Sequence, residues 1–319
     1  MCLVLGACAG STTSTAPSTP PAAAAFPVTV KHKLGSTVIP AEPRRVVALG
    51  GADADIAVAL GVRPVAMPRY FSGTDGRAPW LASQPGTASV ELLDISGDEG
   101  GGGDVSLEKV AALRPDLILA GQYFGIEAQY DNLTPIAPVI TYQQVQLTDS
   151  WQEQTMVIGR ALGRVEQARQ VVSEVETKIK ELRRDHPQFQ GKTASYSFHF
   201  APDAIQTINS TSDYAAQLLN NLGLSLPPAV TALRGDQGAR ISLEQLGILN
   251  ADVLIISYAS DDLRTSLESS PVFQAVPAVR NGHYLPVSLD TITALRLPSV
   301  LSIPYGLDQL EPGLAKVLG

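Results

Sequence analysis

The chain has 319 residues, of which 45% are apolar, and a net charge of −8 at pH 7. This acidic balance argues against nucleic acid as a partner, because a phosphate-binding surface needs an excess of Lys and Arg. The chain has no run of about 18 uncharged apolar residues that would predict a membrane-spanning helix. Its length predicts about two domains of ordinary size.

The first 26 residues predict a lipid anchor and a tether. Both cysteines lie here, and Leu5-Gly-Ala-Cys8 matches the bacterial lipobox, in which the Cys is lipidated. Ser, Thr, Pro and Ala dominate residues 9–26, which are too polar to fold alone. We therefore expect lipidation at Cys8 and attachment to the outer face of the cytoplasmic membrane; an incidental Cys in a disordered tail is the alternative. Residues 1–7 are short for a signal peptide, which is expected to begin upstream.

Residues 27–149 predict an N-terminal α/β lobe. Its expected elements are a hairpin, a buried strand, a helix and a second strand at residues 28–39, 43–51, 53–60 and 62–67. The loop at residues 68–80 is aromatic and cationic, and a loop at the carboxyl end of a parallel strand faces the ligand crevice in open α/β sheets. Four successive glycines make residues 97–104 a flexible connector.

Residues 150–186 predict a helical linker. Ser150-Trp-Gln-Glu153 is a capping box, and a helical pattern continues to about Asp185. Apolar residues recur in it at heptad spacing, so a coiled-coil dimer is an alternative. Because two of these positions are alanines and only about four heptads are available, a helix that bridges two lobes is favoured, with a break at Gly163.

Residues 187–319 predict a C-terminal α/β lobe. Strands are expected at residues 192–199 and 283–287, and a helix at residues 213–222. A terminal helix is expected within residues 297–318, interrupted by Pro304 and Pro312 because proline removes a helical hydrogen bond.

A repeat relates the two lobes. Residues 106–120 and 242–256 both read as a helix N-capped by Ser, with Glu108 or Glu244 in its first turn, followed by an apolar strand. Each copy is half of a βαβ unit. The fold class is therefore α/β, with two Rossmann-like lobes joined by a long helical linker and a ligand groove between the lobes.

Catalytic motifs are missing from the sequence. Gly191-Lys-Thr193 resembles the end of a P-loop, but His186 stands where that motif requires its first glycine. The four histidines lack metal-ligand spacing. We expect a binding protein without enzymatic activity and without a bound metal of its own.

Three features carry a family resemblance: the paired Ser-Leu-Glu helices, the opening Arg44-Arg-Val-Val-Ala-Leu49 and the ending Leu297-Pro-Ser-Val-Leu-Ser-Ile-Pro304. With the linker Ile158-Gly-Arg-Ala-Leu-Gly163 and the order of elements, they resemble the ferric-siderophore substrate-binding proteins of ABC importers. The resemblance implies a monomer without a cofactor, a ferric siderophore complex as ligand and a membrane permease as partner. It also implies that Glu108 and Glu244 dock on the permease; the alternative is that each complements its helix dipole.

The resemblance further implies aromatic walls and a few arginines around the ligand. Matching side chains at predicted strand ends and in loops are Arg69, Tyr70, Trp80, Tyr123, Phe124, His199, Arg234, Tyr258 and Arg296, with Phe71, Phe200 and Arg240 beside them. Core packing is the alternative for each aromatic residue.

Some relatives complete the iron shell with a His and a Tyr, which residues 235–239 and 288–292 lack. A siderophore that fills all six iron positions is therefore favoured. A haem carrier, with His199 or Tyr258 as axial ligand, or a cobalamin carrier is the alternative.

Overall fold

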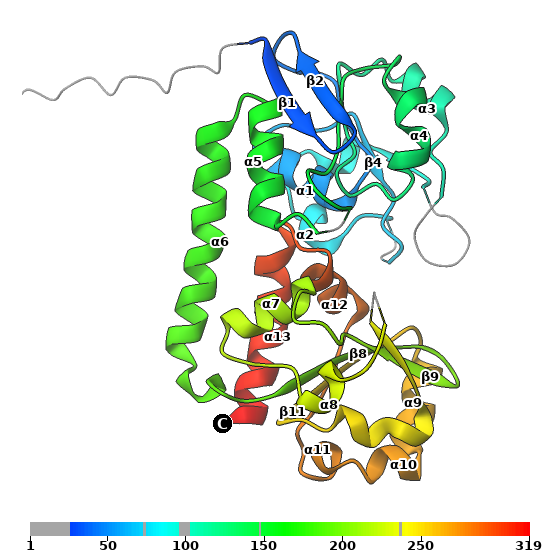
Figure 1. Cartoon of the computed structure of the whole chain (residues 1–319), viewed down its shortest axis with the longest axis vertical. Coiled ribbons are helices and arrows are strands. Elements are labelled where there is room, and N and C mark those ends of the chain that lie inside the picture. Colours follow the sequence, from blue (N-terminus) through cyan, green and yellow to red (C-terminus); the bar gives the residue numbers. More distant parts are fainter. Residues whose placement is uncertain (1–25, 73–74, 96–102, 147, 236–237) are drawn as a thin grey trace, which may run out of the picture.

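The protein was analysed as a computed structural model that describes residues 26–72, 75–95, 103–146, 148–235 and 238–319. Two lobes, each built on a five-stranded sheet, lie one above the other in Figure 1. This arrangement confirms the α/β fold class. Cys8 and most of the glycine-rich connector lie outside the described residues. No helix in the described ranges has the length and apolar character needed to cross a membrane.

The N-terminal lobe has an all-parallel sheet in the order β5-β4-β3-β6-β7. A hairpin precedes it, as predicted. The strands are β1 (Val28–His32), β2 (Gly35–Ile39), β3 (Val46–Ala48), β4 (Ala66–Pro68), β5 (Glu91–Leu93), β6 (Leu117–Leu119) and β7 (Val139–Ile140). The helices are α1 (Gly51–Ala59), α2 (Pro79–Ala82), α3 (Leu107–Ala112) and α4 (Ile126–Leu133), with a 3-10 turn at Thr87–Ser89.

The C-terminal lobe has a mixed sheet in the order β10-β9-β8-β11-β12, in which β8, β11 and β12 run parallel. The strands are β8 (Ala194–Ala201), β9 (Ala204–Thr207), β10 (Ala239–Ser242), β11 (Val253–Tyr258) and β12 (Tyr284–Val287). The helices are α7 (Tyr214–Asn221), α8 (Pro228–Thr231), α9 (Asp261–Ser269), α10 (Pro271–Gln274), α11 (Pro277–Arg280), α12 (Leu289–Arg296) and α13 (Ser302–Leu318), with 3-10 helices at Pro187–Phe189 and Leu243–Leu249.

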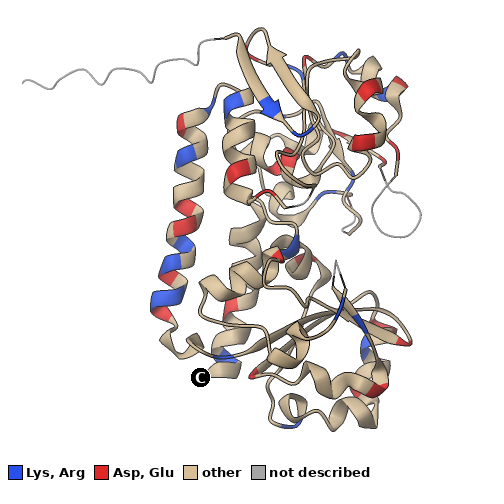
Figure 2. Cartoon of the chain, in the orientation of Figure 1, with Lys and Arg blue, Asp and Glu red and all other residues tan. Residues whose placement is uncertain are grey.

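Helices α5 (Trp151–Ala161) and α6 (Val165–Asp185) connect the lobes along one side of the molecule (Figure 1). Ser150 caps α5 by accepting a hydrogen bond from the backbone N–H of Glu153 at 3.1 Å. The predicted break occurs at Gly163, whose φ of +70° favours glycine. Figure 2 shows charged residues of both signs along α6. The apolar stripe of α6 packs on α5, α7 and α13 of the same chain, so the coiled-coil alternative is not needed.

Two expectations about helices are corrected. The second copy of the repeat forms a 3-10 helix instead of an α-helix. Ser242 is the last residue of β10, and its side chain makes no capping hydrogen bond to the 3-10 helix. The first copy does form α3, with Ser106 as its N-cap. The terminal helix α13 is not interrupted, because it continues through Pro312. Its buried face, which includes Leu310 and Leu314, stabilises the helix against the lost hydrogen bond.

The two lobes share their hydrophobic core. One buried cluster extends from Val30 in β1 through α5 and α6 to Tyr196 in β8 and Leu310 in α13. A second cluster joins Trp80 of the N-terminal lobe to Ala294 of α12. Such continuous packing couples the lobes, because closely packed interiors resist deformation. The exact lobe boundaries, at residues 26/27, 149/150 and 186/187, stay a prediction.

Candidate ligand-binding site

Helix α12 lies between the two lobes in Figure 1. Side chains of both lobes pack against it. From the N-terminal lobe, the hydroxyl of Tyr70 lies near Asp290, and burial together with the charge of Asp290 raises the pKa of Tyr70. From the C-terminal lobe, the hydroxyl of Tyr196 donates to the carbonyl oxygen of Ile292 at 3.0 Å. The helix thus joins the two lobes, beside the carboxyl end of β4 on one side and Tyr196 of β8 on the other.

The loop after β4 presents Tyr70 and Phe71 at this surface. The backbone N–H of Tyr70 donates to the carbonyl oxygen of Gly76 at 2.8 Å, which closes a turn. Gly76 has a φ of +70°, and a Cβ there would lie 2.6 Å from the Arg69 guanidinium, so the turn requires glycine. The ring of Phe71 lies 4.5 Å from that of Tyr70 and is 64% exposed.

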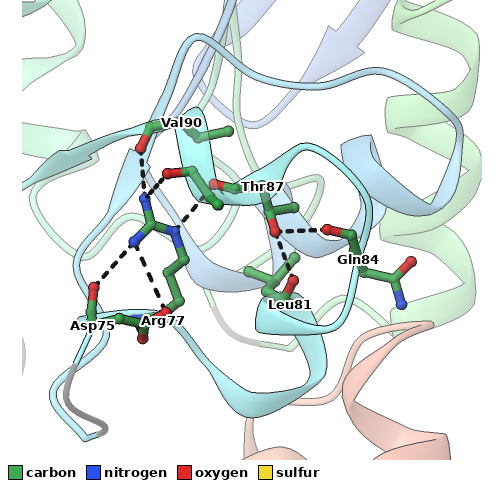
Figure 3. A network of polar contacts seen from close by, with 7 residues as sticks. Asp75, Arg77, Leu81, Gln84, Thr87 and Val90 are labelled. Carbon is green, nitrogen blue, oxygen red and sulfur yellow. Dashed lines mark hydrogen bonds and ion pairs between the residues drawn. The ribbon is translucent and has the colours of Figure 1, made fainter.

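Arg77 fixes the rest of this loop (Figure 3). Its guanidinium donates to the carbonyl oxygens of Thr87, Ala88 and Val90 at 2.9 to 3.1 Å and to that of Asp75 at 3.1 Å. Because carbonyl oxygens occupy its donors, Arg77 holds the backbone of the loop instead of facing a ligand. Arg77 therefore anchors the end of the loop to residues 87–90.

The C-terminal lobe contributes a stack of three side chains. The guanidinium of Arg296, at the end of α12, lies 4.7 Å above the buried ring of Phe198. The ring of Phe200 stacks on Phe198 with centroids 5.7 Å apart and 10° between the planes, and it is 47% exposed. Arg296 also approaches Asp213 at 3.9 Å. Burial raises the pKa of Asp213, and the charge of Arg296 opposes that shift.

We call Tyr70, Phe71, Phe198, Phe200, Arg296 and Leu297 the interlobe patch. It combines the exposed rings of Phe71 and Phe200, one from each lobe, with the guanidinium of Arg296 at the end of α12. Such a combination suits a bulky ligand that carries aromatic or apolar groups and negatively charged oxygen atoms. The sequence predicted Tyr70 and Arg296 as site residues, and the structure brings them to the same helix.

Arg234 lies in the loop between α8 and β10 and is exposed. The side-chain amide of Asn209 donates to the carbonyl oxygens of Leu233 and Gly235, at 3.0 and 3.2 Å, and thereby pins the backbone on both sides of Arg234. Arg234 itself makes no hydrogen bond or ion pair with the described residues. Sequence reasoning missed Asn209, which lies two residues after the end of β9.

Trp80 was expected at the ligand, and the structure corrects this. The indole is 8% exposed, and its N–H donates to Asp55 Oδ2 at 2.8 Å. The hydroxyl of Ser299 donates to the same oxygen at 2.5 Å, which links α1 to the segment before α13. Burial raises the pKa of Asp55 to about 7, although both hydrogen bonds oppose the shift. Trp80 therefore packs between the lobes, 5.4 Å from the ring of Tyr305.

Tyr123 and His199 are corrected in the same way. Tyr123 is 2% exposed, and its hydroxyl donates to Gln129 at 2.8 Å. His199 is 1% exposed, and burial lowers the pKa of its imidazole. Both side chains are core residues, because the elements that cover them come from elsewhere in the chain.

The other predicted site residues differ in exposure and in whether their side chains are already bonded within the chain. Tyr258 is half-buried and its hydroxyl shares a 2.7 Å hydrogen bond with Tyr284. Phe124 is exposed beyond β6. Arg69 pairs with Asp94 at 2.6 Å, and Arg240 with Asp203 at 2.9 Å. Among these four residues, Phe124 is the one that is exposed and for which no ion pair or side-chain hydrogen bond is described.

The described residues contain no group of three or more His, Cys, Asp or Glu side chains that could hold a metal ion.

A surface cavity of about 480 Å³ lies away from the interlobe patch, at the C-terminal end of α6. Its lining includes Lys180, Arg183, Arg184 and His186. Basic residues in the last turn complement the helix dipole, and His186 pairs with Glu311 at 2.7 Å. These contacts account for the charges there without a ligand.

Glu108 and Glu244, the expected docking residues, are both exposed. Hydrogen bonds from its own backbone N–H and from the hydroxyl of Ser106, the latter at 3.0 Å, lower the pKa of the Glu108 carboxyl group. Glu244 stands in the 3-10 helix at Leu243–Leu249. The two positions are therefore alike in exposure and differ in local structure.

Comparison with known proteins gives consistent matches. A family model described as periplasmic binding protein matches residues 46–285. The crystal structure of a periplasmic solute-binding protein from Mycobacterium smegmatis is 30% identical, covers 92% of this chain and 99% of that chain, and has a TM-score of 0.79. The Bacillus subtilis protein named probable siderophore-binding lipoprotein YfiY is 25% identical, over 97% of this chain and 93% of its own. The Fe(3+) dicitrate-binding periplasmic protein FecB of Escherichia coli is 24% identical, over 85% and 86%.

Proposed function

The chain belongs to the periplasmic binding protein family, and on that basis we propose that it captures a ferric siderophore complex outside the cytoplasmic membrane and delivers it to an ABC importer. The interlobe patch carries the proposal. Relatives with names that refer to siderophores or ferric complexes support it, since they align over nearly the whole chain. Proteins of this family bind a substrate, and the proposed role includes no enzymatic step.

The iron would arrive fully coordinated by the siderophore. The described residues offer no cluster of metal ligands, whereas the interlobe patch offers aromatic faces and Arg296. Such a surface contacts the organic skin of a complex and its oxygen atoms. The haem alternative loses support, because His199 is buried and the hydroxyl of Tyr258 is bonded to Tyr284. No cofactor is part of the proposal.

The shared core of the two lobes supports binding with little closure. Asp55, Trp80 and Ser299 tie α1 and α2 to the start of α13, and the apolar clusters continue across the junction. A monomer held rigidly in this way would present a preformed surface, which reduces the ordering cost of binding.

Attachment and delivery complete the proposal. A lipid on Cys8 would hold the protein at the outer face of the membrane, in reach of the permease. Glu108 and Glu244, one on each lobe, would meet basic residues of that permease. Two similar lobes facing a two-fold symmetric partner would need matching charges at matching places.

Titration of the purified protein with ferric siderophores tests the proposal. Trp80 lies 5.5 Å from the ring of Tyr70, so a coloured ferric complex on the interlobe patch is expected to quench tryptophan fluorescence. We expect saturable quenching by at least one ferric hydroxamate, catecholate or carboxylate complex, and weaker quenching by the iron-free siderophore. Haem, which would give a Soret band, serves as the comparison. Binding of haem with no binding of any ferric siderophore would refute the proposal.

A further inference from the structure

Two exposed phenyl rings, one from each lobe, stand at the interlobe patch. Phe71 is 64% exposed and Phe200 is 47% exposed, although aromatic rings of this size usually pack in the interior. We propose that Phe71 and Phe200 bind planar aromatic rings of the ligand, so that its class is a ferric complex with aryl iron-binding groups such as catecholates. This inference rests on the proposed function and names the substrate class of the same site.

The backbone around Phe200 presents its ring. The pairing of β8 with β9 is regular at Phe198 and at Ala201, and the register shifts between them. Irregularities of this kind re-aim side chains and are common beside functional sites. The ring of Phe200 is also held from one side, because it stacks on Phe198 with 10° between the planes. Because the ring is 47% exposed, it can also stack on a ring of the ligand.

Arg296 adds a positive charge beside the stacked rings of Phe198 and Phe200. Arg296, the last residue of α12, lies 4.7 Å above the ring of Phe198. A guanidinium attracts both the face of an aromatic ring and the oxygen atoms of an anionic ligand. Ferric tricatecholates carry a net negative charge and expose flat rings. Arg234, on its pinned loop, adds a second exposed cation in the same lobe.

The side chains at the interlobe patch suit aryl ligands better than hydroxamates or carboxylates. Tyrosine hydroxyls would suit the amide and carboxylate oxygens of such ligands, but the hydroxyl of Tyr70, the tyrosine of the interlobe patch, is buried. Six of the other eight tyrosines bond within the chain: Tyr123, Tyr142, Tyr196, Tyr214, Tyr258 and Tyr284. A phenyl face offers no hydrogen bond and gains most from another ring in an offset or edge-on arrangement. The exposed aromatic surface therefore favours aryl groups.

Phe200→Leu, Phe200→Trp and the control Val272→Ala test the proposal. Leucine keeps an apolar side chain at position 200 and removes the ring, whereas tryptophan keeps a ring. Val272 is an exposed apolar residue of α10. Affinities for a ferric tricatecholate and a ferric trihydroxamate are measured by fluorescence quenching, with the melting temperature of each variant recorded to exclude misfolding.

The wild type is expected to prefer the tricatecholate. Phe200→Leu should weaken tricatecholate binding two- to tenfold, as expected for a lost ring contact, and leave trihydroxamate binding unchanged. Phe200→Trp and Val272→Ala should bind the tricatecholate within about twofold of the wild type. Unchanged tricatecholate affinity in Phe200→Leu, or a wild-type preference for the trihydroxamate, would overturn the inference and leave the proposed function standing. Failure of every ferric complex to bind would overturn both.

Discussion

Asp55 links the lobes through a carboxyl group that is expected to make folding stability depend on pH. The side chain is 2% exposed, and burial raises its pKa to about 7 from the ordinary value of 3.8. The folded protein therefore binds this proton more tightly than the unfolded chain does. By linkage, the free energy of unfolding falls as the pH rises from about 4 to about 7, and this contribution is constant above that range.

The size of the effect follows from the two pKa values. Between them the slope is about 1.4 kcal/mol per pH unit and flattens near pH 7, so Asp55 should lower the free energy of unfolding by about 2 kcal/mol from pH 5 to pH 7. Asp55→Asn removes the titrating group and keeps an oxygen that can accept from Trp80 and Ser299. The variant should lose about 2 kcal/mol of this pH dependence.

Urea unfolding at pH 5, 6 and 7, followed by far-UV circular dichroism, measures the slope for both proteins. Asp53→Asn is the matched comparison, since burial raises the pKa of Asp53 only to about 6 and predicts a smaller change, of about 1 kcal/mol. Ion-paired surface carboxylates such as Asp94, with a lowered pKa, titrate below this window. Equal slopes in the wild type and Asp55→Asn would refute the argument that the buried carboxyl group controls this pH dependence.

Three further predictions concern the loop, the anchor and the permease. Asn209→Ala should lower affinity for the ferric complex about as much as Arg234→Ala, because it frees the backbone that positions the guanidinium; equal affinity in Asn209→Ala and the wild type, measured by the same titration, would contradict this. Cys8→Ser, expressed with a complete signal peptide, should move the protein from the membrane fraction to the soluble fraction, and unchanged fractionation would exclude the anchor. Glu108→Lys combined with Glu244→Lys should retain ligand affinity and abolish uptake in cells, whereas normal uptake would leave these residues only a role at their helix ends.

Local interactions made part of the fold readable in the sequence. The Ser150 cap depends on Glu153, three residues later, and the break at Gly163 depends on the glycine itself. Each feature is therefore specified by a short stretch of sequence. The same holds for α7, where Asp213 accepts from the N–H of Ala215 at 2.9 Å and Gly223 follows the helix with a φ of +100°. The presence of two lobes followed from such signals and from the repeated Ser-Leu-Glu segments.

Contacts between distant segments decided what the sequence left open. Trp80 and Phe200 both follow predicted strands, yet Trp80 is buried because Asp55 and Ser299, 244 residues apart, meet at its indole. Phe200 stays 47% exposed, because among the described residues the ring stacked on it, that of Phe198, covers only one of its faces. From the sequence, Trp80 and Phe200 are both aromatic residues that follow a predicted strand. A local sequence pattern predicts backbone conformation, and it does not predict whether a side chain is buried. Whether such a side chain is core or binding surface depends on which other element packs against it, and only the tertiary structure determines that.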